Sequence, residues 1–279
     1  MTDIETSLNK AAKLVRKAEG ILVGTGAGMG VDSGLPDFRG NEGFWRAYPP
    51  IAKLGLRFDE MANPRWFAND HTLAWGFYGH RLHLYRDATP HDGFGILTRW
   101  AENMPLGNFV YTSNVDGHFQ RAGLAPGKIL ECHGSLKHLQ CLADCGQAIW
   151  PAEDTQVSVD LATLRASPPL PACPSCGELA RPNVLMFGDW GWDSGRTNEQ
   201  RKRFLNWTDK VEGRKVIAIE IGAGKAVPTV RHACEQFAAD SDGNLIRINP
   251  RDVNVPRGSI ALPFGGLEAL NRLDEILNS

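Results

Sequence analysis

The chain has 279 residues, of which 42% are hydrophobic and 22% are charged, and its formal net charge is −2. This composition is typical of a globular protein with ample material for a core. The near balance of charges leaves no broad basic field for DNA or RNA, so we expect no nucleic-acid partner. No apolar run approaches the roughly 20 residues of a membrane span, so we expect no membrane partner either.

The N-terminus and the cysteine content both bear on the cellular compartment. The first residues lack the basic and apolar regions of a secretory signal, which predicts a cytoplasmic location. In a reducing compartment, the six cysteines are better interpreted as thiols or metal ligands than as disulfides.

The N-terminal part of the chain resembles the start of a nucleotide-binding fold. Apolar residues recur at helical spacing over residues 4–18, and the apolar run 21–23 is typical of a buried strand. The glycine-rich stretch 24–40 follows that strand directly, an arrangement typical of a site for a nucleotide diphosphate. Its glycine spacing only half matches G-x-G-x-x-G. Taken by itself, this stretch could therefore also be interpreted as a flexible surface loop.

Alternating strands and helices follow. The aromatic-rich segment 41–66 is expected to be irregular, as either a flap beside a ligand or a static hydrophobic cover. We predict helices at about 64–86, 91–102, 198–211, 227–238 and 267–277, and strands at 108–112, 128–132, 215–221 and 244–248. This order predicts an α/β fold, a Rossmann-like and mostly parallel sheet with helices on both faces.

Between residues 136 and 182 the sequence changes to short strands, prolines and paired cysteines, which indicates an inserted module. We expect residues 1–135 and 183–279 to form a Rossmann-type domain, with 41–90 as a flap and as the helical part of a small domain. Residues 136–182 would form a small zinc-binding module.

Two cysteine pairs within this module have metal-ligand spacing. Cys141 and Cys145 form one pair, Cys173 and Cys176 the other, and each pair is followed by glycine. Four thiolates in two closely spaced pairs suit tetrahedral Zn²⁺, and a closed four-sulfur site is structural. Four unrelated free thiols are the alternative interpretation.

Polar residues gather where predicted strands end. Asn114 and Asp116 follow one strand, and His133 follows the next, so all three are expected to face the same crevice as the glycine-rich loop. His133 is a candidate general base. Cys132 beside it is better interpreted as an ordinary buried cysteine. A nucleophilic role is the alternative, although the sequence offers no second base for it.

Several motifs, taken in order, resemble those of the sirtuins, the NAD-dependent protein deacylases. They are Gly26-Ala27-Gly28 through Pro36-Asp37-Phe38-Arg39, Ser113-Asn114-Val115-Asp116-Gly117, His133-Gly134, the two cysteine pairs, Arg181-Pro182-Asn183-Val184 through Phe187-Gly188-Asp189, and Ile246-Arg247-Ile248-Asn249. The resemblance runs from about residue 7 to residue 275 and implies the sirtuin fold with structural zinc.

The resemblance also implies a cofactor site and a reaction. NAD would be bound by Gly26, Ala27, Gly28, Asp37, Phe38, Arg39, Ser113, Asn114, Asp116, His133, Gly222 and Asn249. The catalytic residues would be His133, Asn114 and Asp116. In sirtuins, acyl-lysine displaces nicotinamide from NAD, and the histidine deprotonates a ribose hydroxyl. Free lysine and O-acyl-ADP-ribose are released, so an acylated protein is the implied partner, and we expect a monomer.

A second motif concerns the acyl group. Tyr78 and Arg81 lie three residues apart on one face of a predicted helix and resemble the Tyr-x-x-Arg of sirtuins that remove succinyl and malonyl groups. Arginine offers a two-pronged donor for a carboxylate, and the tyrosine hydroxyl can assist. A solvated arginine beside a core tyrosine is the alternative.

Four departures from the sirtuin pattern affect the substrate prediction. Ser113 replaces a glutamine, and Asp189 replaces a glutamate. The segment 190–195 is unlike the usual short segment that pairs with the substrate backbone, and the stretch 220–228 lacks the usual Gly-Thr-Ser. The last feature resembles sirtuins paired with macrodomains, which are protein ADP-ribosyltransferases. We therefore expect removal of acetyl or acidic acyl groups from lysine, with ADP-ribosyl transfer or NAD hydrolysis as alternatives.

Overall fold

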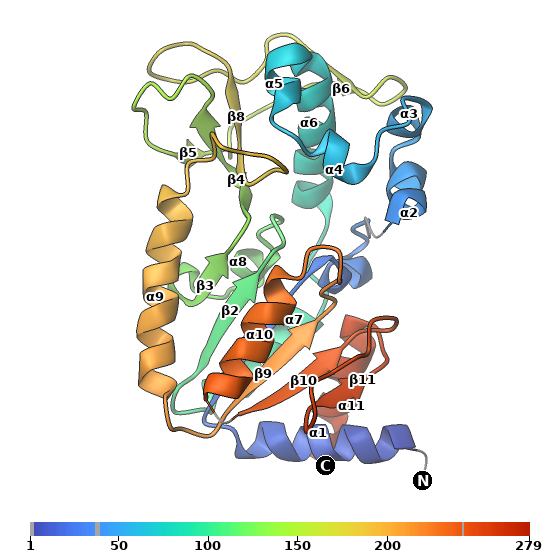
Figure 1. The fold of residues 1–279 in the computed structure, drawn as a ribbon, viewed down its shortest axis with the longest axis vertical. Helices are drawn as coiled ribbons and strands as arrows, with labels where there is room; N and C mark the ends of the chain where they lie inside the picture. Colours follow the sequence, from blue (N-terminus) through green and yellow to red (C-terminus); the bar gives the residue numbers. More distant parts are fainter. Residues whose placement is uncertain (1–2, 37–39, 242) are drawn as a thin grey trace.

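The computed structural model describes residues 3–36, 40–241 and 243–279, which form two bodies, one above the other in Figure 1. The lower body holds a parallel six-stranded sheet in the order β11-β10-β9-β1-β2-β3. Its strands are β1 (Gly20–Thr25), β2 (Asn108–Thr112), β3 (Ile129–Glu131), β9 (Val216–Ile221), β10 (Asn244–Ile248) and β11 (Ile260–Leu262). The predicted Rossmann-like fold is confirmed, and β11 is an addition to it.

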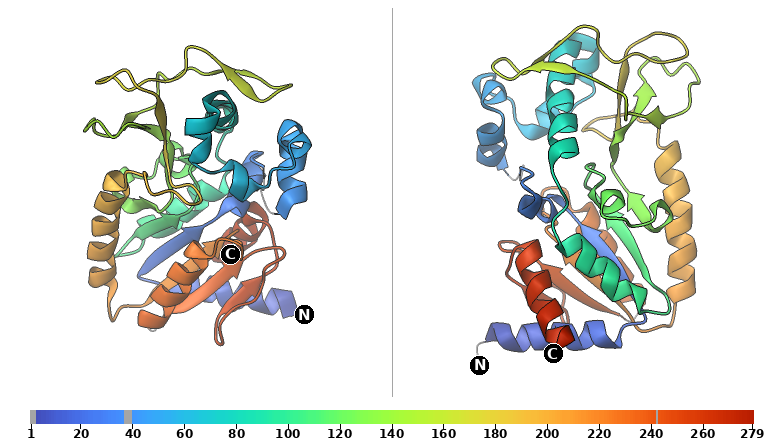
Figure 2. Two further views of the ribbon diagram at one scale, coloured as in Figure 1. Left: turned by 45° about the horizontal axis from the view of Figure 1, so that its top comes forward. Right: turned by 180° about the vertical axis from the view of Figure 1, so that it is seen from behind.

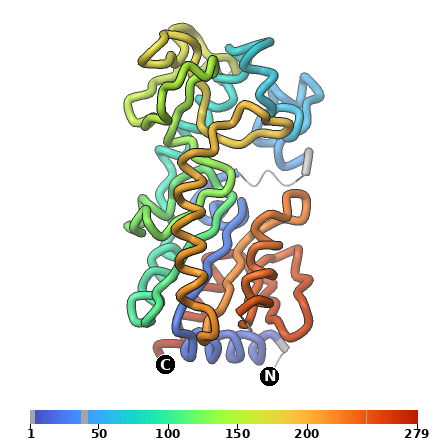
Figure 3. The backbone as a smooth tube through the Cα atoms, turned by 60° about the vertical axis from the view of Figure 1, so that its left-hand side comes forward, coloured from blue at the N-terminus to red at the C-terminus, as the bar shows by residue number. Residues whose placement is uncertain are grey.

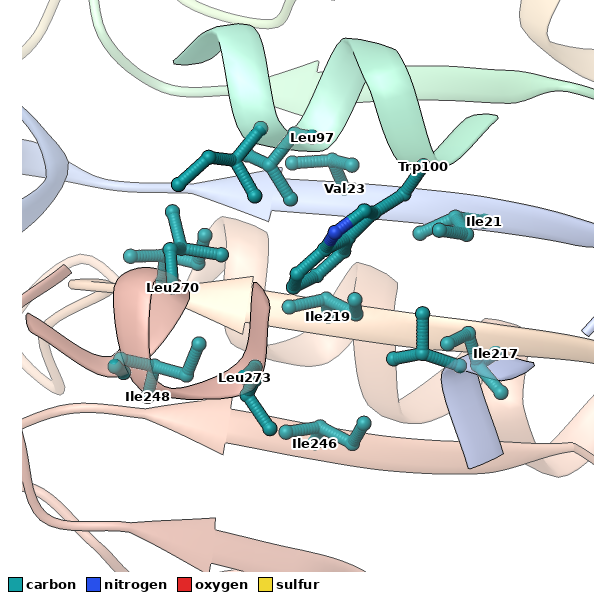
Figure 4. Packing of buried hydrophobic residues seen from close by; sticks show 14 of the residues in the cluster. Ile21, Val23, Leu97, Trp100, Ile217, Ile219, Ile246, Ile248, Leu270 and Leu273 are labelled. Atoms are coloured by element: carbon teal, nitrogen blue, oxygen red, sulfur yellow. The ribbon is translucent and has the colours of Figure 1, made fainter. Parts of the chain in front are cut away.

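Helices cover both faces of this sheet because its side chains alternate. Ile21 and Val23 of β1 pack toward α1, α7 and α11, whereas Leu22 between them packs toward α9 and α10. Figure 4 shows the first of these layers, and Figure 2 shows its helices from behind. The helices of the lower body are α1 (Asp3–Lys17), α7 (Gly93–Glu102), α8 (His118–Arg121), α9 (Gly195–Val211), α10 (Thr229–Asp240) and α11 (Gly266–Asn278).

The upper body begins with five helices where the sequence predicted an irregular segment and one long helix. They are α2 (Gly40–Ala47), α3 (Pro49–Lys53), α4 (Phe58–Met61), α5 (Arg65–Asn69) and α6 (His71–Asp87). The aromatic residues drive this folding, since Phe44, Tyr48 and Phe77 pack ring to ring. The long helix is divided because Asp70 leaves the helical conformation and caps the amide of Leu73.

Short strands complete the upper body. β4 (Gly134–Cys141) pairs antiparallel with β5 (Trp150–Pro151) and β8 (Ala180–Val184), and β6 (Ser158–Asp160) pairs with β7 (Arg165–Ser167). After β8, α9 returns along one side of the molecule to the lower body (Figure 3). The chain thus crosses between the bodies next to the carboxyl ends of the sheet strands.

None of the helices in the described part of the chain is both long and apolar enough to cross a membrane.

Candidate active site

The glycine-rich loop after β1 is held against the loop after β9 by backbone groups. The amide of Gly26 donates to the carbonyl of Ile221, and the amide of Gly28 donates to that of Gly222, both at 3.0 Å. Gly222 has φ +65°, and a Cβ there would lie 2.5 Å from the Cα of Gly28. The contact therefore requires glycine. Ala27, at the tip, remains exposed to a ligand.

Asn114 connects the glycine-rich loop to the end of β2. Its Nδ2 donates to the carbonyl of Gly26 at 3.0 Å, and its own amide donates to Oγ1 of Thr112. The hydroxyls of Thr25 and Thr112 are hydrogen bonded at 2.7 Å beneath it, and the amide of Ser113 donates to the carbonyl of Thr25 at 3.1 Å. The predicted residues Asn114 and Ser113 thus adjoin the loop, whereas the supporting threonine pair was not anticipated.

Asp116 is the buried acid of the site, with 7% of its surface exposed. Burial raises the pKa of its carboxyl to about 6. The hydrogen bond from the amide of His118, at 2.9 Å, lowers this pKa but does not offset the effect of burial. The carboxyl therefore titrates near neutral pH. A buried carboxyl with such a strongly perturbed pKa, in the loop that follows a strand of a parallel sheet, is a typical functional group.

His133 follows β3, and the register Thr112↔Glu131 places it beside the residues that end β2. Burial lowers the pKa of its imidazole below the usual value, so the ring is neutral at neutral pH and able to accept a proton. The turn is fixed by Gly134, which has φ +77° and whose Cβ would lie 2.1 Å from the carbonyl oxygen of Asn183. The predicted base is therefore placed where β4 meets β8.

Cys132 is excluded as a nucleophile by its surroundings. Its side chain is buried, and burial raises the pKa of the thiol to about 12. A thiol in this state is inert at neutral pH.

The remaining predicted cofactor residues are divided between the described and undescribed parts of the chain. Asn249 follows β10 and donates from Nδ2 to the carbonyl of Ala223 at 3.0 Å, which brings it to the loop that contains Gly222. Asp37, Phe38 and Arg39 lie outside the described residues.

The predicted acyl-binding residues Tyr78 and Arg81 are both buried on α6, with 1% and 6% of their surfaces exposed. The solvated alternative for Arg81 is therefore wrong. Burial raises the pKa of Tyr78 to about 12, and its hydroxyl has no hydrogen-bond partner among the described residues. Arg81 donates from Nε and Nη2 to the hydroxyl of Tyr85, at 3.2 and 2.8 Å. Tyr85 was missed, although its spacing of four residues from Arg81 was available as a signal.

Buried ion pairs near the strand ends were also missed. Arg247 of β10 donates to both carboxylate oxygens of Glu220 in β9, at 2.8 and 2.6 Å, and to Glu235. Arg181 of β8 pairs with Asp189, and both side chains are almost completely buried. Charged residues inside otherwise apolar strands were the available signal.

The four paired cysteines converge in the upper body. Their sulfur atoms all lie within 4.8 Å of one another, with 3.6 Å between Cys141 and Cys176 and between Cys145 and Cys173. Four sulfurs at about 2.3 Å from a tetrahedral Zn²⁺ lie roughly 3.8 Å apart, so the donor set fits zinc. All four positions are protein ligands, which is the arrangement of a structural site.

Comparisons with known proteins agree with this geometry. A profile described as "Sir2 family" matches residues 26–203. An "NAD-dependent protein deacylase" of Thermococcus kodakarensis is 35% identical over 182 residues, which are 65% of each chain. One of Thermus thermophilus is 33% identical over 271 residues, 94% of this chain and 92% of the relative.

Solved structures agree over the whole chain. A mutant Sir2 homologue in complex with ADP ribose is 26% identical with a TM-score of 0.72, covering 100% of this chain and 97% of that one. A Sir2 homologue in complex with NAD is 25% identical with a TM-score of 0.72, covering 96% and 93%. The alignments with three of the curated relatives span only 65%, 66% and 60% of the relatives' lengths. Profile, sequence and fold nevertheless agree, and the chain belongs to the Sir2 family.

Proposed function

We propose that the protein is an NAD-dependent lysine deacylase. One observation carries the proposal: Asn114 donates to the glycine-rich loop at the carboxyl edge of the sheet, and the register of β2 with β3 puts His133 beside the residues that end β2. Curated relatives named NAD-dependent protein deacylase support the activity, and a Sir2 homologue solved with NAD supports the co-substrate. The partner would be a protein that carries an acylated lysine.

The described residues fit NAD as a bound group. Gly26, Ala27 and Gly28 form a backbone cradle in which a Cβ at Gly26 would lie 2.7 Å from the Cα of Ala223. They would hold the diphosphate of NAD, and Gly222 and Asn249 would lie beside its adenosine. Asp37, Phe38 and Arg39 would join them, with Ser113 on the ribose side. Bound NAD supplies a glycosidic bond that releases nicotinamide when it breaks.

Each catalytic side chain has a distinct task in this proposal. Asn114 is oriented by its bond to the carbonyl of Gly26, so its amide would orient the nicotinamide ribose. Asp116, whose carboxyl is buried, would bind the nicotinamide amide. His133 is neutral at neutral pH and would take a proton from a ribose hydroxyl at its imidazole nitrogen.

We further propose that the acyl group carries a carboxylate. Tyr78 and Arg81 are adjacent on α6, and the Arg81 guanidinium lies 5.9 Å from the Tyr78 ring. A buried guanidinium next to a neutral hydroxyl is a favourable site for an acidic acyl group such as succinyl or malonyl.

One observation favours the alternative of ADP-ribosyl transfer to a protein. The amides of Leu185, Met186 and Phe187 donate within the chain to His133, Asp189 and Ala62 respectively. These amides follow β8, where an extended acceptor peptide would pair. Because these amides already donate within the chain, fewer backbone groups remain to pair with an extended peptide. A folded protein is therefore favoured as the acceptor. NAD hydrolysis is the third outcome to test.

One assay distinguishes these activities. The protein is incubated with NAD and matched acetyl-lysine or succinyl-lysine peptides, and nicotinamide release and peptide mass are followed. We expect peptide-dependent release with loss of the acyl mass. His133→Ala should lower the rate at least ~100-fold, in line with the loss of a general base. Arg81→Met should reduce kcat/KM for the succinyl peptide about tenfold more than for the acetyl peptide.

Matched controls are available for both variants. His232 is exposed on α10, and Arg86 is on the same helix as Arg81 but donates to the backbone of Ala152 and Thr155. His232→Ala and Arg86→Met should leave the rates and the selectivity within about twofold. Deacylation that survives His133→Ala contradicts the mechanism, mass gain on a protein indicates ADP-ribosyl transfer, and release without peptide indicates hydrolysis.

The remaining assignments are proposals about organisation. We propose that residues 1–135 and 183–279 form the NAD-binding domain, with 41–90 contributing the flap and the helical part of the small domain, and that 136–182 form the zinc module. The proposed zinc is structural, the proposed location is the cytoplasm, and the proposed functional unit is a monomer.

A further inference from the structure

Tyr85 fixes the orientation of the Arg81 guanidinium from one helical turn away. Nε and Nη2 of Arg81 both donate to the same hydroxyl oxygen, at 3.2 and 2.8 Å. Two bonds from one edge of a planar group to one acceptor fix the plane of that group as well as its position. The long arginine side chain, which otherwise loses much rotamer entropy on binding a ligand, is thereby ordered in advance.

Aromatic rings surround the same guanidinium. Its central carbon lies 5.4 Å from the ring centroid of Phe77, 5.9 Å from that of Tyr78 and 5.3 Å from that of Tyr85. These contacts favour the cation without neutralising it. The backbone around Tyr85 is held as well, because Arg121 donates from Nη1 to the carbonyl of Tyr85 at 2.8 Å.

The chemistry of the acceptor matters for a site that takes an anion. A glutamate at position 85 would form an ion pair with Arg81 and compete with any incoming carboxylate. A phenol accepts the same two N–H bonds while remaining neutral, and burial raises the pKa of Tyr85, which keeps it neutral. Tyr85 therefore orients the positive charge of Arg81 without cancelling its attraction for an acyl carboxylate.

We propose that Tyr85 is a positioning residue for acyl selectivity, holding Arg81 in the orientation that receives the carboxylate of an acidic acyl-lysine. This inference rests on the proposed deacylase function and adds a residue that would not touch the substrate. It predicts that the hydroxyl of Tyr85, and not merely the packing of its ring, determines the preference for acidic acyl groups.

The test compares Tyr85→Phe, which removes only the hydroxyl, with Arg121→Met, which loosens the same end of α6 but keeps that hydroxyl. Kinetics are measured on succinyl-lysine and acetyl-lysine peptides at saturating NAD. For Tyr85→Phe we expect KM for the succinyl peptide to rise about tenfold, with kcat changed less than about threefold, because one hydrogen-bonded anchor of a charged group is lost. The ratio of kcat/KM for succinyl over acetyl should fall about tenfold. Arg121→Met should keep that ratio within about twofold.

Three results would overturn the inference: an unchanged ratio in Tyr85→Phe, an equal fall in Arg121→Met, or a fall in kcat alone. If the wild type removes neither acyl group, the proposed function fails. In that case the inference is tested by calorimetric titration with the succinyl and acetyl peptides, which measures peptide binding in the absence of catalysis. Binding of the succinyl peptide that weakens about tenfold in Tyr85→Phe supports it, and equal or absent binding refutes it.

Discussion

The carboxyl group of Asp116 is buried with one hydrogen bond from the amide of His118, and burial raises its pKa from an ordinary value near 3.8 to about 6. Between these two values the folded state holds the proton more tightly than the unfolded state. The free energy of unfolding therefore falls as the pH rises from about 4 to 6. Above about pH 6 the fold carries the full destabilisation due to the ionised carboxylate. The ionised acid is thus retained at the expense of stability, as expected of a functional group.

We expect Asp116→Asn to stabilise the fold at pH 7.5 by about 1 to 2 kcal/mol, because the amide keeps the acceptor for His118 but is never charged. Thermal unfolding followed at pH 7.5 and pH 4 measures this gain, which should vanish at pH 4. Deacylation should be lost in the same variant. The exposed Asp154 offers a control, since Asp154→Asn should change neither quantity. A gain that persists at pH 4 would show that the effect is not due to ionisation.

At the scale of elements, the loops after β1 and β9 form one unit. In the described part of the chain they are joined by backbone hydrogen bonds, and their close approach requires glycine at positions 26 and 222. Because the backbones of Gly26 and Gly28 pack directly against those of Gly222 and Ala223, a displacement of one loop should displace the other. The predicted cofactor cradle is therefore a property of two strand ends rather than of the glycine-rich motif alone.

Gly222→Ala tests this coupling. The residue has φ +65°, and the new methyl group would lie 2.5 Å from the backbone of Gly28, so the loops must separate. We expect a loss of stability of about 1 to 3 kcal/mol and at least tenfold weaker NAD binding, measured by calorimetric titration. Gly224→Ala is the matched control, since its Cβ would meet nothing within 4 Å. Equal effects of both variants would contradict the close-packed cradle.

The sequence predicts regular elements well and side-chain partners poorly. The strands around β1 were predictable because short continuous apolar runs are typical of strands that are buried on both faces of a parallel sheet. The division at Asp70 was not, because it depends on a side chain capping its own helix and bonding the distant Arg165. The sequence placed Tyr78 and Arg81 on one helix face, but only packing reveals that Arg81 is buried and directed to Tyr85.

At the scale of the whole molecule, the chain passes from the parallel sheet to the upper body beside the proposed base, between β3 and β4. Glu131, at the end of β3, forms an ion pair with Arg196 of α9 and accepts from Gln200, while its carbonyl accepts from Thr197. α9 therefore begins against the strand that leads to His133 and runs along one side of the lower body, away from the upper body (Figure 3). β4 of the upper body begins directly after His133. Loosening the upper body should therefore disturb substrate contacts more than it disturbs the parallel sheet.

The metal site lies wholly within the upper body, which allows a test of how far the bodies depend on each other. Metal removal by a chelator, or Cys176→Ser, withdraws a ligand set that holds β4 to the turn at residues 173–176. Structural zinc contributes folding free energy directly, so the small sheet should loosen. The parallel sheet is packed on both faces by its own helices and should remain folded.

We expect amide hydrogen exchange to accelerate at least ~100-fold in residues 134–184 of the chelated protein or of Cys176→Ser, while residues 216–221 and 244–248 stay protected. Loss of zinc is confirmed by elemental analysis. Ser175→Ala, in the same turn but outside the sulfur cluster, should retain both zinc and protection. Equal acceleration in both bodies would mean that they unfold as one cooperative unit. The zinc site would then stabilise the parallel sheet as well as the upper body.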